Sequence, residues 1–170
     1  MKFLAPLALL VSAVAASPIL QARDTAKSFY LKTSGAANDA HNNLYVYAYH
    51  TGAGFNDAVL TAEKSTARTV TLNGTNAQFD LGTTLPWGFK MGADTNYASW
   101  EPVQINVGYG DEGFSINGTS LEWSEQNGFG GWLVCEWYHN APQLFWLYKY
   151  IPATVPSSCD KVDLTVEYSS

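Results

Sequence analysis

Apolar and polar positions alternate with period two along much of the chain after residue 28. The clearest examples are Leu44–His50, in which every second residue is a tyrosine, and Val162–Tyr168, in which apolar residues alternate with charged and hydroxyl side chains. Phe29–Thr33 continues the pattern at the start of the region. Because successive side chains of a β-strand point to opposite faces, this pattern predicts strands with one buried and one wetter face.

Further short segments of similar character are separated by clusters of Gly, Pro, Asn and Asp. They are Ala67–Leu72, Gln78–Leu81, Trp87–Met91, Val103–Val107, Phe114–Ile116 and Leu121–Ser124. Strands at intervals of about 8 to 12 residues with such turns are typical of antiparallel sandwiches and barrels. The sequence therefore predicts an all-β fold, a single antiparallel β-sandwich or flattened β-barrel.

Two of the predicted hairpins resemble each other and introduce an alternative fold. Val70–Thr75 reads VTLNGT and Phe114–Thr119 reads FSINGT, at an offset of 44 positions. A β-trefoil would repeat such a unit three times at about this period. The sequence contains no clean third copy, so the trefoil stays the alternative to the sandwich or flattened barrel.

The densest apolar and aromatic stretch is Phe129–Leu147. Its two runs, Trp132–Trp137 and Gln143–Tyr148, are separated by a short connection with turn-forming residues, Tyr138–Pro142, and so predict a hairpin. Both faces of the two runs are apolar, which predicts that most of their side chains are buried. We expect this hairpin to hold the fold together, and we expect mainly the residues of its turn to be available for contacts at the surface.

The N-terminal segment is distinct from the rest of the chain. Residues 1–16 combine an early lysine, an apolar run and small residues at the end, which is typical of a secretory signal peptide. The run is shorter than the roughly 20 residues that span a bilayer, so we expect no membrane association after cleavage. Residues 17–27 are expected to form a flexible lead-in, with processing after Arg23 as an alternative, and residues 28–170 a single all-β domain.

Composition supports β structure and argues against one class of partner. Aromatic residues make up 14% of the chain and charged residues also 14%, against about 25% charged in an average domain. The formal net charge is −6, and the nine Lys and Arg residues are scattered. Nucleic-acid binding depends on clustered Lys and Arg that neutralise phosphates, so no nucleic-acid partner is expected.

Cys135 and Cys159 are the only cysteines. In an oxidising compartment, two thiols in one small domain most often pair, so we predict a disulfide. Closing a loop of about 25 residues would stabilise the fold by roughly 3 kcal/mol on the chain-entropy model. A reactive thiol or a metal ligand is the alternative interpretation.

Two segments satisfy the acceptor pattern for N-linked glycosylation, with Asn73 and Asn117 as the acceptors. Both lie at predicted turns, where a transferase would reach them. Asn-Gly is also a preferred two-residue hairpin turn, so the same residues are expected at these places without a glycan.

The alternation in Leu44–His50 gives one strand face made of Tyr45, Tyr47 and Tyr49. Such a face could serve as a stacking platform for a sugar or another planar ligand. The turn of the central hairpin adds Tyr138 and His139 as further candidate ligand-binding residues. The alternative is a sheet face half covered by neighbouring side chains, with each hydroxyl reaching water.

Catalytic and metal chemistry have little support in the sequence. Glu122 and Glu136 are flanked by tryptophan, which would desolvate a carboxylate and raise its pKa, so they are the candidate glycosidase pair. A structural hydrogen bond is the alternative for each. His41, His50 and His139 share no metal-ligand spacing, so neither a metal site nor a cofactor is expected.

Several blocks of the chain carry a family resemblance. They are LYVYAYHTGAGFNDAVL (Leu44–Leu60), LNGTNAQFDLG and PWGFKMG (within Leu72–Gly92), WEPVQINVGYG (Trp100–Gly110), GFGGWLVCEWYHNAPQLFW (Gly128–Trp146) and VPSSCDKV (Val155–Val162). With these blocks the chain resembles an uncharacterised family of small secreted proteins of filamentous fungi, a domain of unknown function. In plan it is distantly similar to fungal cell-wall proteins linked to the development of spore-bearing cells. The resemblance implies a compartment and a fold, and it brings no catalytic residue.

These inferences combine into one expected function and two rivals. We expect a secreted fungal protein, extracellular or associated with the cell wall, that is not an enzyme and binds glycan through exposed aromatic side chains. Its partners would be cell-wall polysaccharide or an extracellular protein. The rivals are a secreted polysaccharide hydrolase and an effector or allergen-like protein that binds a host protein.

Overall fold

The computed structural model describes residues 27–93, 99–124, 128–152 and 154–169. The predicted signal peptide, Arg23 and nearly all of the predicted lead-in lie outside these ranges. The described strands are β1 (Phe29–Ser34), β2 (Tyr45–Gly52), β3 (Phe55–Thr61), β4 (Val70–Asn73), β5 (Asn76–Phe79), β6 (Trp87–Met91), β7 (Trp100–Val107), β8 (Phe114–Asn117), β9 (Ser120–Trp123), β10 (Phe129–Glu136), β11 (Pro142–Tyr148) and β12 (Cys159–Tyr168). Two short 3-10 turns, η1 (Asp39–His41) and η2 (Tyr138–Asn140), complete the described secondary structure. Within these ranges, no helix has the length and apolar character that crossing a membrane would require.

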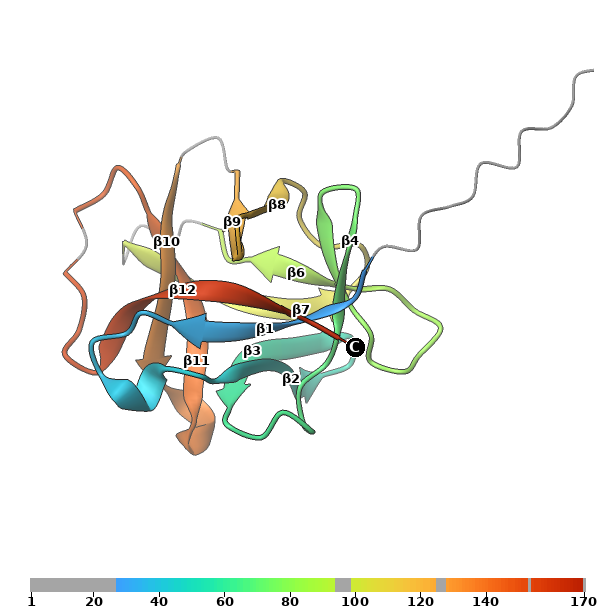
Figure 1. The fold of residues 1–170 in the computed structure, drawn as a ribbon, viewed down its shortest axis with the longest axis horizontal. Coiled ribbons are helices and arrows are strands. Elements are labelled where there is room, and N and C mark those ends of the chain that lie inside the picture. Colours follow the sequence, from blue (N-terminus) through green and yellow to red (C-terminus); the bar gives the residue numbers. More distant parts are fainter. Residues whose placement is uncertain (1–26, 94–98, 125–127, 153, 170) are drawn as a thin grey trace, which may run out of the picture.

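The strands form a closed antiparallel barrel of nine strands with additional strands, which confirms the predicted flattened barrel (Figure 1). The ring runs β1, β12, β10, β11, β3, β7, β6, β5 and β4, and β4 returns to β1 through the pair Phe29 and Val70. Strand β2 bridges β1 and β3, and the β8–β9 hairpin is attached to β12. The two similar hairpins of the sequence are β4–β5 inside the ring and β8–β9 outside it. They hold unequal places, so the repeat reflects similar turn chemistry and not a trefoil.

The β10–β11 hairpin is buried on both of its faces, as its sequence predicts. Trp132, Val134, Leu144 and Trp146 point into the main core, together with inward residues of the other strands. The opposite face belongs to a second cluster, formed by Leu133, Cys135, Phe145, Leu147 and Cys159 with Trp100 and Val155 packed against it. Packing on two sides explains why these strands lack alternation.

The predicted disulfide is confirmed. Cys135 and Cys159 lie directly opposite each other in the antiparallel pairing of β10 and β12, with their Cα atoms 4.1 Å apart. The bond therefore ties the central hairpin to the first residue of the last strand. That strand pairs with β1 from Asp163 to Tyr168, so the disulfide fixes the end of β12 that lies beyond this pairing.

Strand β3 is the element that the sequence pattern misses, since its residues fall in none of the predicted strands. It pairs with β2, β7 and β11, and Ala58, Val59 and Leu60 are all buried. Consecutive buried residues remove the alternation that marks a half-exposed strand.

The turns of the two similar hairpins lie one residue later than the expected Asn-Gly turns. Their two-residue loops are Gly74-Thr75 and Gly118-Thr119, and each asparagine is the last residue of its strand.

The loop after β7 lies tightly against β6. The Asp111 carboxylate accepts a hydrogen bond from the Met91 backbone N–H at 2.7 Å and pairs with Lys90. The Asp111 N–H donates to the Phe89 carbonyl at 2.8 Å. Gly110 has a φ of +76°, and a Cβ added there would lie 2.2 Å from the same carbonyl oxygen. This position therefore requires glycine for two reasons, its backbone conformation and the close approach of β6.

We predict that Gly110→Ala destabilises the protein by about 3 kcal/mol, since it combines left-handed strain with a backbone clash. Gly74→Ala is the matched control, because Gly74 also has a positive φ, +63°, but its Cβ would meet no atom within 4 Å. The control should cost about 1 kcal/mol. Urea unfolding measures both values, and equal losses would contradict the role given to the close approach.

Candidate functional site

The three tyrosines of β2 lie on the outer face of the barrel. Val46 is buried in the main core and Ala48 packs against it, so their neighbours along the strand face outward. Tyr45 and Tyr47 are half-buried, whereas Tyr49 is 36% exposed. Burial, followed by the proximity of Tyr49, raises the pKa of Tyr47 above its ordinary value. The predicted tyrosine face therefore exists, and Tyr49 is its exposed end.

The Tyr45 end of this face is held by an ionic network. The Tyr45 hydroxyl donates to Glu167 at 3.0 Å, and Lys32 lies 3.2 Å from the same carboxylate oxygen. Lys64 pairs with the other oxygen and sits 4.7 Å from the centre of the Tyr30 ring. The hydrogen bond from Lys64, and then that from Tyr45, lower the pKa of Glu167 to about 2. Tyr45 is thus engaged in joining β2 to β12.

The Tyr49 end meets the connection between β10 and β11. The rings of Tyr49 and His139 stack, with centroids 4.0 Å apart and planes 26° from parallel. His139 Nε2 lies 3.1 Å from Asp57 Oδ2 on β3. The structure therefore brings together Tyr49 and His139, two of the predicted ligand-binding residues from distant parts of the sequence.

Aromatic rings continue from His139 through the η2 turn. Tyr138 is 71% exposed and Trp137 is 43% exposed. Trp137 packs edge-on against Trp100 and Phe145 of the second cluster, and these contacts hold its indole ring in place. We call Tyr47, Tyr49, Trp137, Tyr138 and His139 the aromatic surface. Of these residues, sequence reasoning missed only Trp137, which it placed inside the buried hairpin.

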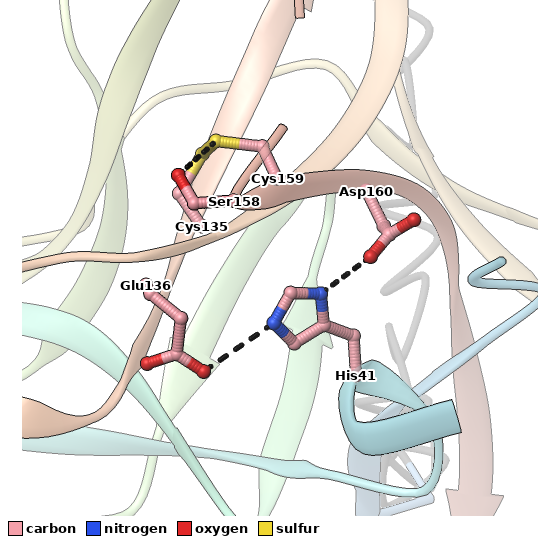
Figure 2. The surroundings of a disulfide bond; sticks show 6 residues. All are labelled: His41, Cys135, Glu136, Ser158, Cys159 and Asp160. Atoms are coloured by element: carbon pink, nitrogen blue, oxygen red, sulfur yellow. Dashed lines mark hydrogen bonds and ion pairs between the residues drawn. A yellow bond between two sulfur atoms is a disulfide. The ribbon is translucent and has the colours of Figure 1, made fainter. Parts of the chain in front are cut away.

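The candidate glutamate Glu136 belongs to a separate cluster beside the disulfide (Figure 2). His41 is only 1% exposed, and its Nδ1 lies 2.6 Å from Asp160 Oδ2. Its Nε2 faces Glu136 Oε1 at 3.4 Å, outside hydrogen-bond geometry. Because the Nε2 atom is buried, a substrate has no access to it. The cluster joins the η1 turn to β10 and β12, and sequence spacing gave no signal for it, since His41 and Asp160 are 119 positions apart.

The second candidate, Glu122, has a different partner. Its carboxylate accepts a hydrogen bond from Asn117 Nδ2 at 3.0 Å within the β8–β9 hairpin. The Glu136 carboxylate instead faces the buried His41. The two candidate glutamates thus have different partners on different elements, and the glycosidase pair stays a prediction.

No group of three or more His, Cys, Asp or Glu side chains in the described ranges is arranged to hold a metal ion.

Comparison with known proteins identifies a family for this chain. A family model described as a domain of unknown function (DUF7907) matches residues 26–168, nearly the whole described region. No curated protein and no solved structure matches the chain. The predicted likeness to an uncharacterised domain family is thereby confirmed.

We predict that Glu167→Gln lowers the free energy of unfolding at pH 7 and that this difference shrinks in acid. A carboxylate with a lowered folded pKa stabilises the protein above its unfolded pKa, near 4.3, and loses that contribution as the pH falls toward about 2. Urea unfolding of both proteins between pH 7 and pH 2 measures the difference. Glu63→Gln removes an exposed carboxylate and serves as the control, and a difference independent of pH for Glu167→Gln would contradict the network.

Proposed function

Because this chain belongs to the DUF7907 family, a domain of unknown function, we propose its role from its own surface: a secreted fungal protein that binds polysaccharide through the aromatic surface. It acts outside the cell or on the cell wall and binds without chemical conversion. The observation that carries the proposal is the stack of His139 on Tyr49, which joins the tyrosine face of β2 to the exposed rings of the η2 turn.

The mechanism is stacking of sugar rings on aromatic side chains. The C–H faces of a sugar pack on the faces of Tyr and Trp rings, and polar neighbours hydrogen-bond the hydroxyls. Tyr49, Tyr138 and Trp137 are exposed enough to offer such contact, and Asp57 lies beside them through its bond to His139.

Two features support an extracellular location. Residues 1–16 have the character of a secretory signal peptide. The Cys135–Cys159 disulfide fits an oxidising compartment, because cytosolic thiols are kept reduced. A fungal source rests on the sequence resemblance given above.

We extend the proposal to N-linked glycosylation at Asn73 and Asn117. Both side chains are exposed, and each lies at the last residue of a strand before a two-residue turn. The Asn73 side chain has no hydrogen-bond partner among the described residues, whereas Asn117 contacts Glu122. Passage through a secretory pathway would expose both acceptors to the transferase.

Pull-down on insoluble chitin, cellulose and β-glucan tests polysaccharide binding by the mature protein. Tyr49→Ala and Tyr138→Ala should each weaken retention about threefold to tenfold, since each ring contact is worth roughly 1 kcal/mol. Tyr109→Ala is the matched control, because Tyr109 is 62% exposed in the loop after β7 and lies outside the aromatic surface. Retention on none of the polysaccharides, or equal losses for all three variants, would overturn the proposed function.

Intact mass of the protein from a eukaryotic secretory host tests glycosylation. We expect a mass shift that falls by one glycan in Asn73→Gln and by one in Asn117→Gln. Glycosidase treatment should return every sample to the mass of its polypeptide. A secreted protein that already has its polypeptide mass before treatment would refute modification at both positions.

A further inference from the structure

A hollow of about 330 Å³ opens in the wall of the barrel where β9, β10 and β12 approach one another. It lies away from the aromatic surface. Its lining is formed by Ser120, Leu121, Glu122, Phe129, Gly131, Trp132, Val162, Asp163 and Leu164.

The hollow exists because β12 changes partner along its length. It pairs with β10 as far as Val162, opposite Trp132, and pairs with β9 at Thr165, opposite Ser120. Among the described strands, Asp163 and Leu164 between these points have no partner residue on that side. A register shift of the kind that a β-bulge gives interrupts the pairing of β10 with β11 between Phe129 and Trp132, beside this gap.

The lining has an apolar floor and a polar rim. Trp132 and Leu164 are buried beneath the hollow, and Phe129 is half-buried at its side. Glu122 and Asp163 are exposed at the rim and can accept hydrogen bonds from hydroxyl or acetamido groups. An aromatic ring with flanking carboxylates is a combination that suits a single sugar ring more than an apolar ligand.

A glycan acceptor stands at the edge of this hollow. Asn117 pairs directly with Ser120, and its Nδ2 donates to Glu122 at 3.0 Å. Both partners line the hollow. Asn117 also ends β8, which pairs only with β9 among the described strands and so forms an edge of the sheet. The nitrogen that would carry a glycan is thus in contact with a residue of the rim.

We propose that the first sugars of an N-glycan on Asn117 fold back into this hollow and fasten the β8–β9 hairpin to β10 and β12. This inference rests on the glycosylation proposed above. In the transfer, Asn117 Nδ2 loses one proton and bonds to the anomeric carbon of N-acetylglucosamine, and the lipid-linked diphosphate of the donor leaves. The amide keeps one N–H, which still donates to Glu122.

Asn73 provides an internal comparison. It occupies the same place in a similar hairpin, β4–β5, with the same Asn-Gly-Thr sequence. Neither Asn73 nor its partner Asn76 lines the hollow. A glycan on Asn73 should therefore project into solvent and leave the barrel wall unchanged.

Hydrogen exchange on the protein from a eukaryotic secretory host tests the proposal. Thr119→Ala removes the acceptor pattern at Asn117 but keeps the bond between Asn117 and Glu122, and Thr75→Ala does the same at Asn73. Intact mass first establishes which asparagine is occupied. We expect exchange in peptides covering residues 120–123, 129–132 and 162–164 to be about tenfold faster in Thr119→Ala than in the wild type, and unchanged in Thr75→Ala.

The outcomes separate this inference from the glycosylation on which it rests. An occupied Asn117 with equal exchange in the wild type and Thr119→Ala would overturn docking and leave glycosylation standing. An unoccupied Asn117 in the secreted wild type would overturn both. Equal acceleration in Thr119→Ala and Thr75→Ala would show a general effect of glycans and would also overturn docking.

Discussion

The structure depends on the pairing of its first and last strands. Strand β1 pairs with β12 from Phe29 opposite Tyr168 to Ser34 opposite Asp163, so the barrel closes only when both ends of the domain are in place. The same last strand carries Cys159, which joins it to the central hairpin, and offers its far half to β9. Contacts between residues so distant in sequence are costly to form, so closure of the ring is expected to limit folding. The disulfide reduces this cost by holding the start of β12 beside β10.

The sequence pattern predicted the strands that have one buried and one exposed face, and also the long hairpin that is buried on both faces. Alternation located β1, β2 and β12, and two-sided apolarity identified the central hairpin as buried. Neither pattern revealed β3. Its residues Ala58, Val59 and Leu60 are all buried, so they do not alternate, and this apolar run is much shorter than that of the central hairpin. The exact turn residues were also missed, since Asn-Gly suggests a turn starting at asparagine, whereas pairing of Asn73 with Asn76 moves it one residue onward.

The candidate site was predicted to a similar extent. The tyrosine face follows from period two, and the turn of the central hairpin was recognised as exposed. The stack of Tyr49 with His139 was not predictable, because it depends on the bond between His139 and Asp57 and on a backbone at His139 with a φ of +71°. Likewise, Glu136 and Glu122 have similar neighbours in the sequence but different partners in the fold. Glu136 faces the buried His41, and Glu122 accepts a hydrogen bond from Asn117. Tertiary contacts between distant residues decide these roles.

The pairing of β1 with β12 has a mechanical consequence. The two strands end side by side, where the Ser28 and Ser169 side chains are hydrogen-bonded (Figure 1). A force that pulls the two ends apart would load the hydrogen bonds of this pair one after another, as in a zipper, and not all at once as in shear. Peeling of β12 would proceed from Tyr168 toward Cys159 and would stop there, because the covalent bond to Cys135 carries the load. Under tension the protein would therefore open at one seam while the part of the barrel that bears the η2 turn stays closed.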